Sequence, residues 1–323
     1  MTAPQRILVF RNGSIGNTLA ALPAMKCIRQ SYPDAHIIVV LDRLGKELLS
    51  NENCFDSIVV YDRRNQDKGI ASFINVAHAL RKCNPDTAIL FKRFTRNGLL
   101  ALFSGARKRF GFVTDGKAPY LTHTVPYDES IHVAELNLRL AKAAGANAEV
   151  SVSPELTISN DDKERAKKWL ADKEITSNYI IAHFGGTTSG AQFVSLSLRS
   201  RLLTELTSNA PTLLIGNGEI EDREARELAR VTVSRVVAVG ESLRMTISLI
   251  SQSTGFIGTN SGPMHIAAAT QIPGIALFNQ SDRFEVERVK WGPMFPDLRV
   301  VPVSPMASDD DIVASARSIW RTK

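Results

Sequence analysis

The 323-residue chain is 44% hydrophobic and 22% charged, which excludes global disorder and favours two domains of roughly 100–200 residues each. Its net charge of +6 lies entirely in the first half, where residues 1–150 hold 20 Lys and Arg against 13 Asp and Glu. This asymmetry predicts an acidic partner for the first half, either a phosphorylated or carboxylated substrate or an anionic membrane face. The alternative is a basic surface that is simply solvated.

Short apolar runs alternate with helical patterns along the first half. Arg6–Phe10 predicts a buried strand, followed by a Gly-containing loop and a single helix from about Asn17 to Ser31. Continuous apolar strands separated by helices favour a parallel sheet covered on both faces. Further strands are predicted at His36–Leu41, Ser57–Tyr61 and Thr87–Phe91, and further helices at Ile70–Lys82 and His132–Ala144.

The pattern weakens over residues 146–160 and then restarts, which predicts a domain 1–152 and a domain 153–323. Two successive doubly wound units predict an α/β protein with two Rossmann-like domains that face a cleft, where ligands bind beyond the carboxyl ends of the strands. The second set of strands is predicted at Tyr179–His183, Thr212–Ile215, Val236–Val239, Gly255–Ile257 and Gly274–Phe278. The second set of helices is predicted at Asp161–Asp172, Leu196–Ser208, Glu219–Arg230, Leu243–Ser251, Pro263–Thr270 and 309–321.

Cysteine usage and the lack of long apolar runs indicate a cytoplasmic protein. Cys27, Cys54 and Cys83 are isolated, so no disulfide framework is expected, and no Cys or His spacing suggests a metal site. The N-terminus leads almost directly into a strand, and no apolar stretch approaches the roughly 18 residues that span a bilayer. Any membrane contact is therefore expected to be peripheral, at the inner face of the cytoplasmic membrane.

The loop after the first strand is a candidate binding site for an anion or a polar ligand. It runs from Arg11 to Asn17 and contains Gly13 and Gly16, which permit a tight turn into a helix whose first N–H groups are free. The loop lacks the Gly-x-Gly-x-x-Gly spacing, so a dinucleotide-binding oxidoreductase is not indicated. An ordinary strand-to-helix turn is the alternative.

Three motifs of the second half predict a nucleotide site. Gly258–His265 lies between a strand and a helix, and a pyrophosphate would fit the helix start formed by Asn260, Ser261 and Gly262, with His265 one turn further on. Glu219 follows the turn opened by Gly216 and either accepts ribose hydroxyls or simply favours the helix dipole. A small-residue loop suited to phosphate follows the strand that ends at His183, and it contains Gly186, Thr187 and Thr188.

A cluster of cations in the first half predicts a wall for an anionic acceptor. Lys92, Arg93, Arg96 and Arg109 belong to a run of six cations without an acid. Nucleic acid is not the expected partner, because aromatic stacking residues are sparse and no binding module is recognisable.

In this order, the motifs resemble glycosyltransferase family 9, the ADP-heptose:lipopolysaccharide heptosyltransferases and their relatives, over nearly the whole chain. The segments that carry the resemblance are Ile7–Pro33, Ser104–Phe112, His132–Gly145, Leu214–Glu219, Ile257–Ala269, Ile272–Phe278 and Trp291-Gly292-Pro293.

The resemblance implies a GT-B fold and inverting transfer of a heptose or related sugar from a nucleotide-sugar, expected to be ADP-linked, without a metal or other cofactor. It places the donor on the second domain and the acidic lipopolysaccharide or other surface-glycan acceptor on the first, with Arg11 and His132 among the acceptor-binding residues. It also implies that the last helix packs back onto the first domain.

Three positions depart from the family pattern. The family usually has its catalytic base, an Asp, where this chain has Asn17 beside Gly16, and an amide cannot accept a proton at neutral pH. Asn260 also replaces an Asp, and residues 191–194 lack a Lys that would stabilise the leaving diphosphate. Asp42 or His183 are candidate replacement bases, and Arg11 or Arg283 candidate replacement cations.

These departures leave alternatives to an active sugar transferase. The first is a catalytically impaired family member that binds a nucleotide or glycan as a regulator or partner. The second is an epimerase or hydrolase of sugar nucleotides on the same fold.

Overall fold

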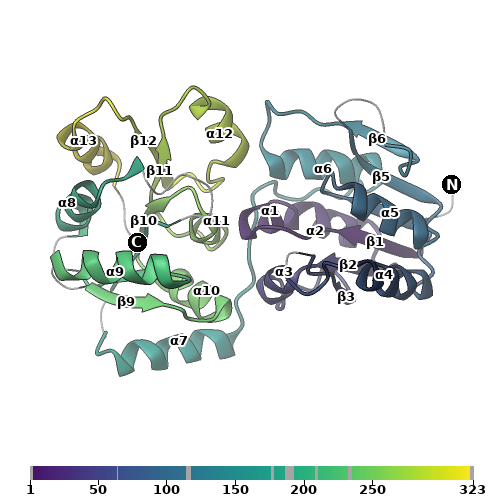
Figure 1. The fold of residues 1–323 in the computed structure, drawn as a ribbon, viewed down its shortest axis with the longest axis horizontal. Coiled ribbons are helices and arrows are strands. Elements are labelled where there is room, and N and C mark those ends of the chain that lie inside the picture. The colour runs from purple at the N-terminus through teal and green to yellow at the C-terminus, as the bar shows by residue number, and fades with distance from the viewer. Residues whose placement is uncertain are drawn as a thin grey trace. The chain divides into compact units, whose positions relative to one another are not determined.

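The computed structural model describes residues 3–63, 65–113, 118–175, 178–185, 193–207, 210–231 and 235–320. It divides the chain into two compact units, Met1–Pro154 and Glu155–Lys323. Each unit carries one six-stranded parallel sheet with helices packed against it (Figure 1). The predicted fold class, two doubly wound α/β sheets, is confirmed.

The first unit has the strand order β3-β2-β1-β4-β5-β6, and all neighbouring strands are parallel. Its strands are β1 (Arg6–Phe10), β2 (His36–Leu41), β3 (Ser57–Val60), β4 (Thr87–Leu90), β5 (Lys108–Val113) and β6 (His123–Pro126). Its helices are α1 (Ile15–Leu19), α2 (Leu22–Ser31), α3 (Arg43–Leu48), α4 (Ile70–Lys82), α5 (Thr95–Phe103) and α6 (Val133–Ala143).

The single helix expected from Asn17 to Ser31 is wrong, because the segment forms the two helices α1 and α2. Pro23 lies in the first turn of α2 and has no backbone N–H with which to continue a helix that arrives from α1. Strands β5 and β6 and helices α3 and α5 were not expected from the sequence. The two strands lack a continuous apolar run, because β5 begins with Lys108 and Arg109 and β6 is largely exposed.

Both faces of the first sheet are buried, which explains why its central strands are apolar throughout. On one face, Leu8 and Phe10 of β1 pack with Val76 and Leu80 of α4 and with residues of α5. On the opposite face, the alternate residues of β1 are also fully buried, and α2 packs against α6. Alternation of buried side chains between the two faces is expected for a covered parallel sheet.

The second unit repeats this topology, with the strand order β12-β11-β10-β7-β8-β9 and parallel neighbours throughout. Its strands are β7 (Ile180–His183), β8 (Thr212–Gly216), β9 (Arg235–Val239), β10 (Gly255–Thr259), β11 (Gly274–Asn279) and β12 (Leu298–Val303). Its helices are α7 (Asn160–Asp172), α8 (Leu196–Thr207), α9 (Glu219–Val231), α10 (Leu243–Ser251), α11 (Gly262–Ala269), α12 (Phe284–Trp291) and α13 (Asp309–Ile319).

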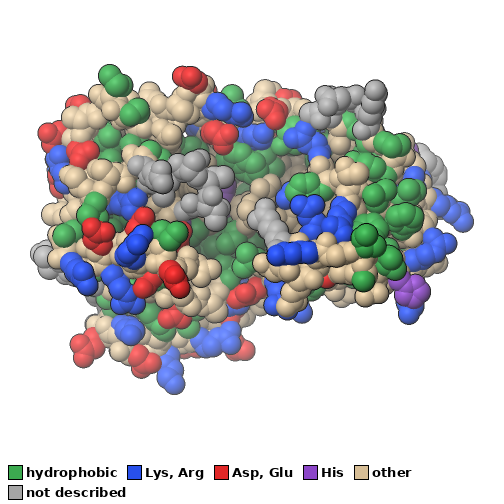
Figure 2. Space-filling view, viewed as in Figure 1, with side chains coloured by type: hydrophobic (Ala, Val, Ile, Leu, Met, Phe, Trp, Pro, Cys, Tyr) green, Lys and Arg blue, Asp and Glu red, His purple; other side chains and the backbone are tan. Residues whose placement is uncertain are grey.

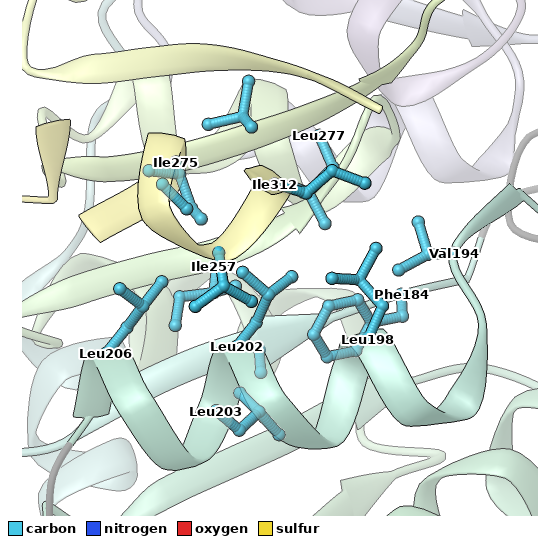
Figure 3. Close-up of a cluster of buried hydrophobic side chains, with 14 of the residues drawn as sticks. Phe184, Val194, Leu198, Leu202, Leu203, Leu206, Ile257, Ile275, Leu277 and Ile312 are labelled. Atoms are coloured by element: carbon cyan, nitrogen blue, oxygen red, sulfur yellow. The ribbon is translucent and has the colours of Figure 1, made fainter. Parts of the chain in front are cut away.

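The last helix, α13, packs inside its own unit. Its buried residues Ile312, Val313 and Ala316 join the core formed by α8 and the sheet, and Figure 3 shows Ile312 beside Leu277 above the leucines of α8. Within the second unit its apolar face packs against α8 and β12, and the expectation that this helix also packs back onto the first domain stays a prediction. None of the helices in the described ranges is long and apolar enough to cross a membrane.

Candidate functional site

Each sheet has one point where the strand order reverses, and ligands of doubly wound sheets bind beyond the carboxyl ends of the strands at that point. In the first sheet the reversal lies between β1 and β4, and in the second it lies between β7 and β10. The polar loops predicted from the sequence follow these same strands. The topology therefore brings Arg11 and Lys92 to one edge, and His183 and Asn260 to another, each within its own unit.

Arg11 is the largest fully buried side chain at the edge of the first sheet, with 1% of its surface exposed. Its Nε donates to the backbone oxygen of Asn17 at 2.8 Å and its Nη1 to that of Phe91 at 3.4 Å. Its Nη2 is buried and has no hydrogen-bond partner in the described part of the chain. Burial lowers the pKa of Arg11 to about 10, although the neighbouring carboxylate of Asp42 acts in the opposite direction.

Asp42 connects the loop after β1 to helix α3 through two hydrogen bonds. Its Oδ2 accepts the N–H of Gly13 at 2.7 Å, and its Oδ1 accepts the N–H of Gly45 at 2.8 Å, which caps α3. Both carboxylate oxygens are therefore occupied by backbone donors. This geometry suits a residue that holds the loop in place.

Asn17 lies half-buried in the short helix α1, directly after the buried Gly16. Its amide Nδ2 donates to the hydroxyl of Ser14 at 2.8 Å, which fixes the orientation of the side chain. An amide oxygen held in this way can accept a hydrogen bond from a substrate hydroxyl, but it cannot remove the proton. The side chain can therefore orient a nucleophile without acting as a base.

Gly13 leaves room for the ammonium group of Lys92. A side chain on Gly13 would place its Cβ 2.9 Å from Lys92 Nζ, and the φ of +153° is rarely adopted by other residues. The Lys92 Nζ also lies 4.0 Å from the centre of the Phe94 ring. Glycine at position 13 thus allows a cation to sit directly over the loop that holds Asn17.

The other predicted acceptor cations divide into two groups. Arg93 stacks on Tyr127 with 3.7 Å from its Cζ to the ring centre, and Arg96 donates to the backbone oxygen of Gly69 at 3.0 Å. Arg109 lies elsewhere: it is the second residue of β5 and pairs in register with Ala88, so it is displaced from the carboxyl edge toward the start of the strands. Its guanidinium donates to the backbone oxygens of Tyr120 and Ala106, both at 2.6 Å. The structure thus removes Arg109 from the predicted cluster.

His132 has a local structural role that the sequence did not reveal. It is the N-cap of α6, and its Nδ1 accepts the N–H of Ala134 at 3.1 Å. The proton of the neutral ring is then on Nε2, so the side chain can act as a donor.

In the second unit, His183 and Ser261 connect the ends of β7 and β10. His183 Nδ1 lies 2.9 Å from Ser261 Oγ, and that hydroxyl also donates to the backbone oxygen of Thr259 at 3.1 Å. Since a hydroxyl has one proton, His183 Nδ1 is the donor to Ser261. The ring is 4% exposed, so both bonds lie in a largely dry setting.

Glu221 completes this group, and sequence reasoning missed it. Its Oε2 lies 3.5 Å from His183 Nε2 and accepts the N–H of Asn217 at 2.7 Å. A Cβ on Gly185 would lie 2.1 Å from Glu221 Oε1, and a Cβ on Gly216 would lie 2.9 Å from its Oε2. The two glycines therefore make space for this carboxylate at the edge of the sheet.

The predicted residue Glu219 is exposed on the first turn of α9, with no described contact to His183. Two positions further along the helix, Glu221 is turned toward the sheet, whereas Glu219 lies in solvent. The sequence could have indicated this, because residues two positions apart in a helix lie on different faces, so Glu219 and Glu221 do not both face the sheet. A small pocket, partly open to solvent, lies beside Glu221. It is lined by Ala182, Phe184, Gly185, Arg199, Leu214, Ile215, Glu224, Ala225 and Leu228.

Helix α11 begins at the same edge with an uncapped first turn. Ser261 occupies the N-cap position but makes no side-chain cap, because its hydroxyl is engaged with His183 and Thr259. Asn260 and Gly262 flank it, both half-buried, and His265 packs edge-on to Trp291 with ring centres 6.4 Å apart. The N–H groups at this helix start are suited to an anion.

The remaining predictions are either outside the described residues or unsupported by contacts. Gly186, Thr187 and Thr188 lie outside the described residues. Arg283 is exposed at the start of α12, with its Nη2 3.8 Å from Glu287. Within the described ranges, no group of three or more His, Cys, Asp or Glu side chains could hold a metal ion.

Two doubly wound units with polar groups at their reversal points define the GT-B class. The chain belongs to glycosyltransferase family 9 (heptosyltransferase), whose model matches residues 73–301, and it is a glycosyltransferase. It is 26% identical to a Haemophilus influenzae protein provisionally named as a glycosyltransferase, over 90% of this chain and 86% of the relative. It is 20% identical to lipopolysaccharide heptosyltransferase 1 of Campylobacter coli, over 86% of this chain and 85% of the relative.

A solved structure shows the same fold. The Escherichia coli ADP-heptose lipopolysaccharide heptosyltransferase II superposes with a TM-score of 0.79 and 18% identity, covering 97% of this chain and 98% of that one. The family match begins after the loop that holds Arg11 and Asn17, so the roles of these two residues depend on their own geometry.

Proposed function

We propose that this glycosyltransferase moves a heptose or related sugar from an ADP-linked donor to an acidic acceptor of the lipopolysaccharide type, with inversion at the transferred carbon. The observation that carries the proposal is the uncapped start of α11. Ser261 stands at the cap position, yet its hydroxyl is bonded to His183 and Thr259. The first N–H groups of the helix are thereby left for a ligand, and a diphosphate is the ligand that a helix start of this kind favours.

Glu221 supports the nucleoside part of the donor. Its carboxylate lies after β8, next to the two glycines that make space for it, and it is partly exposed. Acidic side chains at the ends of such strands accept hydrogen bonds from ribose hydroxyls. The N–H of Asn217 holds this carboxylate in place before any ligand binds.

The first unit supports the acceptor. The segment that follows β4 carries three cations, Lys92, Arg93 and Arg96, and Lys92 lies over the loop of Asn17. Carboxylate and phosphate groups of a core oligosaccharide would be attracted to such a wall. The net positive charge of residues 1–150 agrees with this assignment.

In the proposed reaction, the acceptor hydroxyl oxygen forms a bond to the anomeric carbon while the bond to the nucleoside diphosphate breaks. Attack from the face opposite the leaving group inverts the configuration. Asn17 Oδ1 accepts the hydrogen bond of the attacking hydroxyl and orients it, and the proton leaves to solvent as the new bond forms. We propose that no metal or other cofactor takes part, because the helix dipole of α11 supplies positive charge for the leaving diphosphate.

Ligand binding and turnover together test this function. Nucleoside diphosphates are screened by thermal unfolding, and ADP at ~100 times its dissociation constant should stabilise the protein by about 2.7 kcal/mol. Purified protein is then incubated with ADP-heptose and a lipopolysaccharide core acceptor, and the product is identified by mass and anomeric configuration. A screen without any nucleotide response overturns the donor site, and ADP binding without any transfer identifies a regulator instead of a transferase.

A further inference from the structure

Helices α4 and α5 carry an apolar surface that no described part of the chain covers. We define the α4–α5 patch as Ile70, Phe73, Ile74, Leu102 and Phe103. Four of these are well exposed, at 76% for Ile70, 58% for Ile74, 40% for Leu102 and 51% for Phe103. Figure 2 shows hydrophobic side chains gathered over this part of the first unit, with Lys and Arg beside them. Contiguous exposed apolar groups mark interaction surfaces more often than isolated ones do.

The patch is continuous across the two helices. Phe73 of α4 and Phe103 of α5 meet edge to face, with ring centres 6.1 Å apart. Within α4, Ile70, Phe73 and Ile74 follow the spacing of one helix face, whereas Val76 and Leu80 point into the core. Helix α4 is therefore apolar on two faces, and the core needs only one of them.

Cations without described counter-ions border the patch. Arg81 Nη1 donates to the backbone oxygen of Phe103 at 3.5 Å. Lys82 follows Arg81 at the end of α4, Arg107 comes four residues after Phe103, and both side chains are exposed. Arg81, Lys82 and Arg107 take part in no ion pair among the described residues.

The acids of this region do not neutralise those cations. From residue 63 to residue 113 the sequence has only Asp67 and Asp86. Asp67 accepts hydrogen bonds from the N–H of Asp62 and the hydroxyl of Ser72, and Asp86 Oδ2 accepts the N–H groups of Gln5 and Arg6. The surface around the patch is therefore positive, and a partner with negative charge next to apolar groups would complement it.

We propose that the α4–α5 patch docks on an anionic phospholipid bilayer, with the isoleucines and phenylalanines entering the headgroup region and Arg81, Lys82 and Arg107 contacting lipid phosphates. An apolar face bordered by Lys and Arg is the surface type that lies in a membrane interface. A second copy of the chain fits less well, because it would place the same uncompensated cations opposite one another. The inference concerns binding to a surface and holds whichever sugar the protein transfers.

Vesicle flotation of the full chain tests the docking. Wild-type protein should float with vesicles of equal parts phosphatidylethanolamine and phosphatidylglycerol, and should remain in solution with vesicles of phosphatidylcholine alone. Ile70→Ser with Ile74→Ser should lower the partition coefficient at least about tenfold. Arg81→Gln with Lys82→Gln should lower it by roughly fivefold for each charge removed, and added salt should reproduce that loss.

A matched control uses apolar residues of the second unit. Val231 and Met306 are 56% and 92% exposed, so Val231→Ser with Met306→Ser removes a similar exposed surface and should leave flotation unchanged. Thermal unfolding of all variants shows whether they fold. If the patch variants float like wild type, the proposal is overturned. It is also overturned if light scattering shows that they only convert dimers into monomers.

Insertion into the interface gives a second, independent readout. The three native tryptophans, Trp169, Trp291 and Trp320, all lie in the second unit. In Ile74→Trp, brominated lipids should quench fluorescence at position 74 beyond the level seen with wild type. Equal quenching of the variant and the wild type would show that the patch stays out of the bilayer.

Discussion

The backbone N–H of Gly13 donates to Asp42 Oδ2 at 2.7 Å, and this bond joins the loop after β1 to the start of α3. The other oxygen of the same carboxylate caps α3 through Gly45. One side chain thus supports two segments that differ by about thirty positions in the sequence. Asn17, which orients the attacking hydroxyl under the proposed function, lies in the segment that begins with this bond.

The first prediction concerns Asp42. Asp42→Ala removes both acceptors and should lower the free energy of unfolding by about 1–3 kcal/mol, measured by urea denaturation. Asp42→Asn keeps one acceptor oxygen and should lose less stability, and the shape of its pH–rate profile should match wild type. If Asp42→Asn is as stable as wild type but loses the acidic limb of the profile, Asp42 is the general base after all.

The second prediction is a gain of function at position 17. Asn17→Asp introduces a carboxylate where the amide only orients the acceptor hydroxyl, and general-base catalysis is worth roughly 10²–10⁴-fold. We expect kcat to rise by at least about tenfold, with a new acidic limb in the pH–rate profile. Asn17→Ala is the comparison and should lower kcat. Equal rates for all three forms would show that position 17 does not face the acceptor.

The third prediction distinguishes two acids of α9. Glu221→Gln should weaken ADP binding by about tenfold in calorimetry, because the charged acceptor for the ribose hydroxyls is lost. Glu219→Gln is the matched control, since Glu219 lies on the same helix but is exposed. If Glu219→Gln weakens ADP binding and Glu221→Gln does not, the nucleoside contact is made by Glu219 instead.

The fourth prediction uses the close approach of a glycine to the same carboxylate. In Gly185→Ala the new Cβ would lie 2.1 Å from Glu221 Oε1, so the carboxylate must move and nucleotide affinity should fall. Gly69→Ala serves as the control, because nothing lies within 4 Å of its added methyl group. Unchanged ADP affinity in Gly185→Ala would mean that the position of Glu221 is not important for binding.

The fifth prediction concerns alkaline pH. Burial raises the pKa of the Cys54 thiol to about 12 from an ordinary value near 9. A raised folded-state pKa adds stability that is complete below pH 9 and is lost as the pH rises through 12, by up to about 1.4 kcal/mol per pH unit. Denaturation of wild type and Cys54→Ala from pH 8 upward should show the steeper decline in wild type, and parallel curves would contradict the assignment.

Most of the fold could be predicted from the sequence because each central strand is specified by a local run of apolar residues. Runs such as Arg6–Phe10 are apolar throughout, as strands covered on both faces must be. Strand β6 could not be found in this way, because an edge strand with exposed residues has no such signal. The break between α1 and α2 was visible in principle, since Pro23 marks it.

The candidate site was only partly predictable, since contacts between distant segments cannot be read from spacing. His183, Ser261 and Gly216 could be singled out because they lie at or just after the ends of predicted strands. Glu221 was missed because its role depends on the rotation of α9, and Arg109 was included because charge alone does not show that a guanidinium is bonded to backbone oxygens.

Helix α11 has a consequence for dynamics. A helix whose cap residue is bonded elsewhere has a first turn that frays more readily than a capped one. Under the proposed function, the diphosphate supplies the missing acceptors, so donor occupancy and order of this turn are linked. Amide hydrogens of Gly262 and Met264 would then exchange slowly with the donor bound and quickly without it. Hydrogen exchange at the first turn of α11 would thus measure whether the donor is bound.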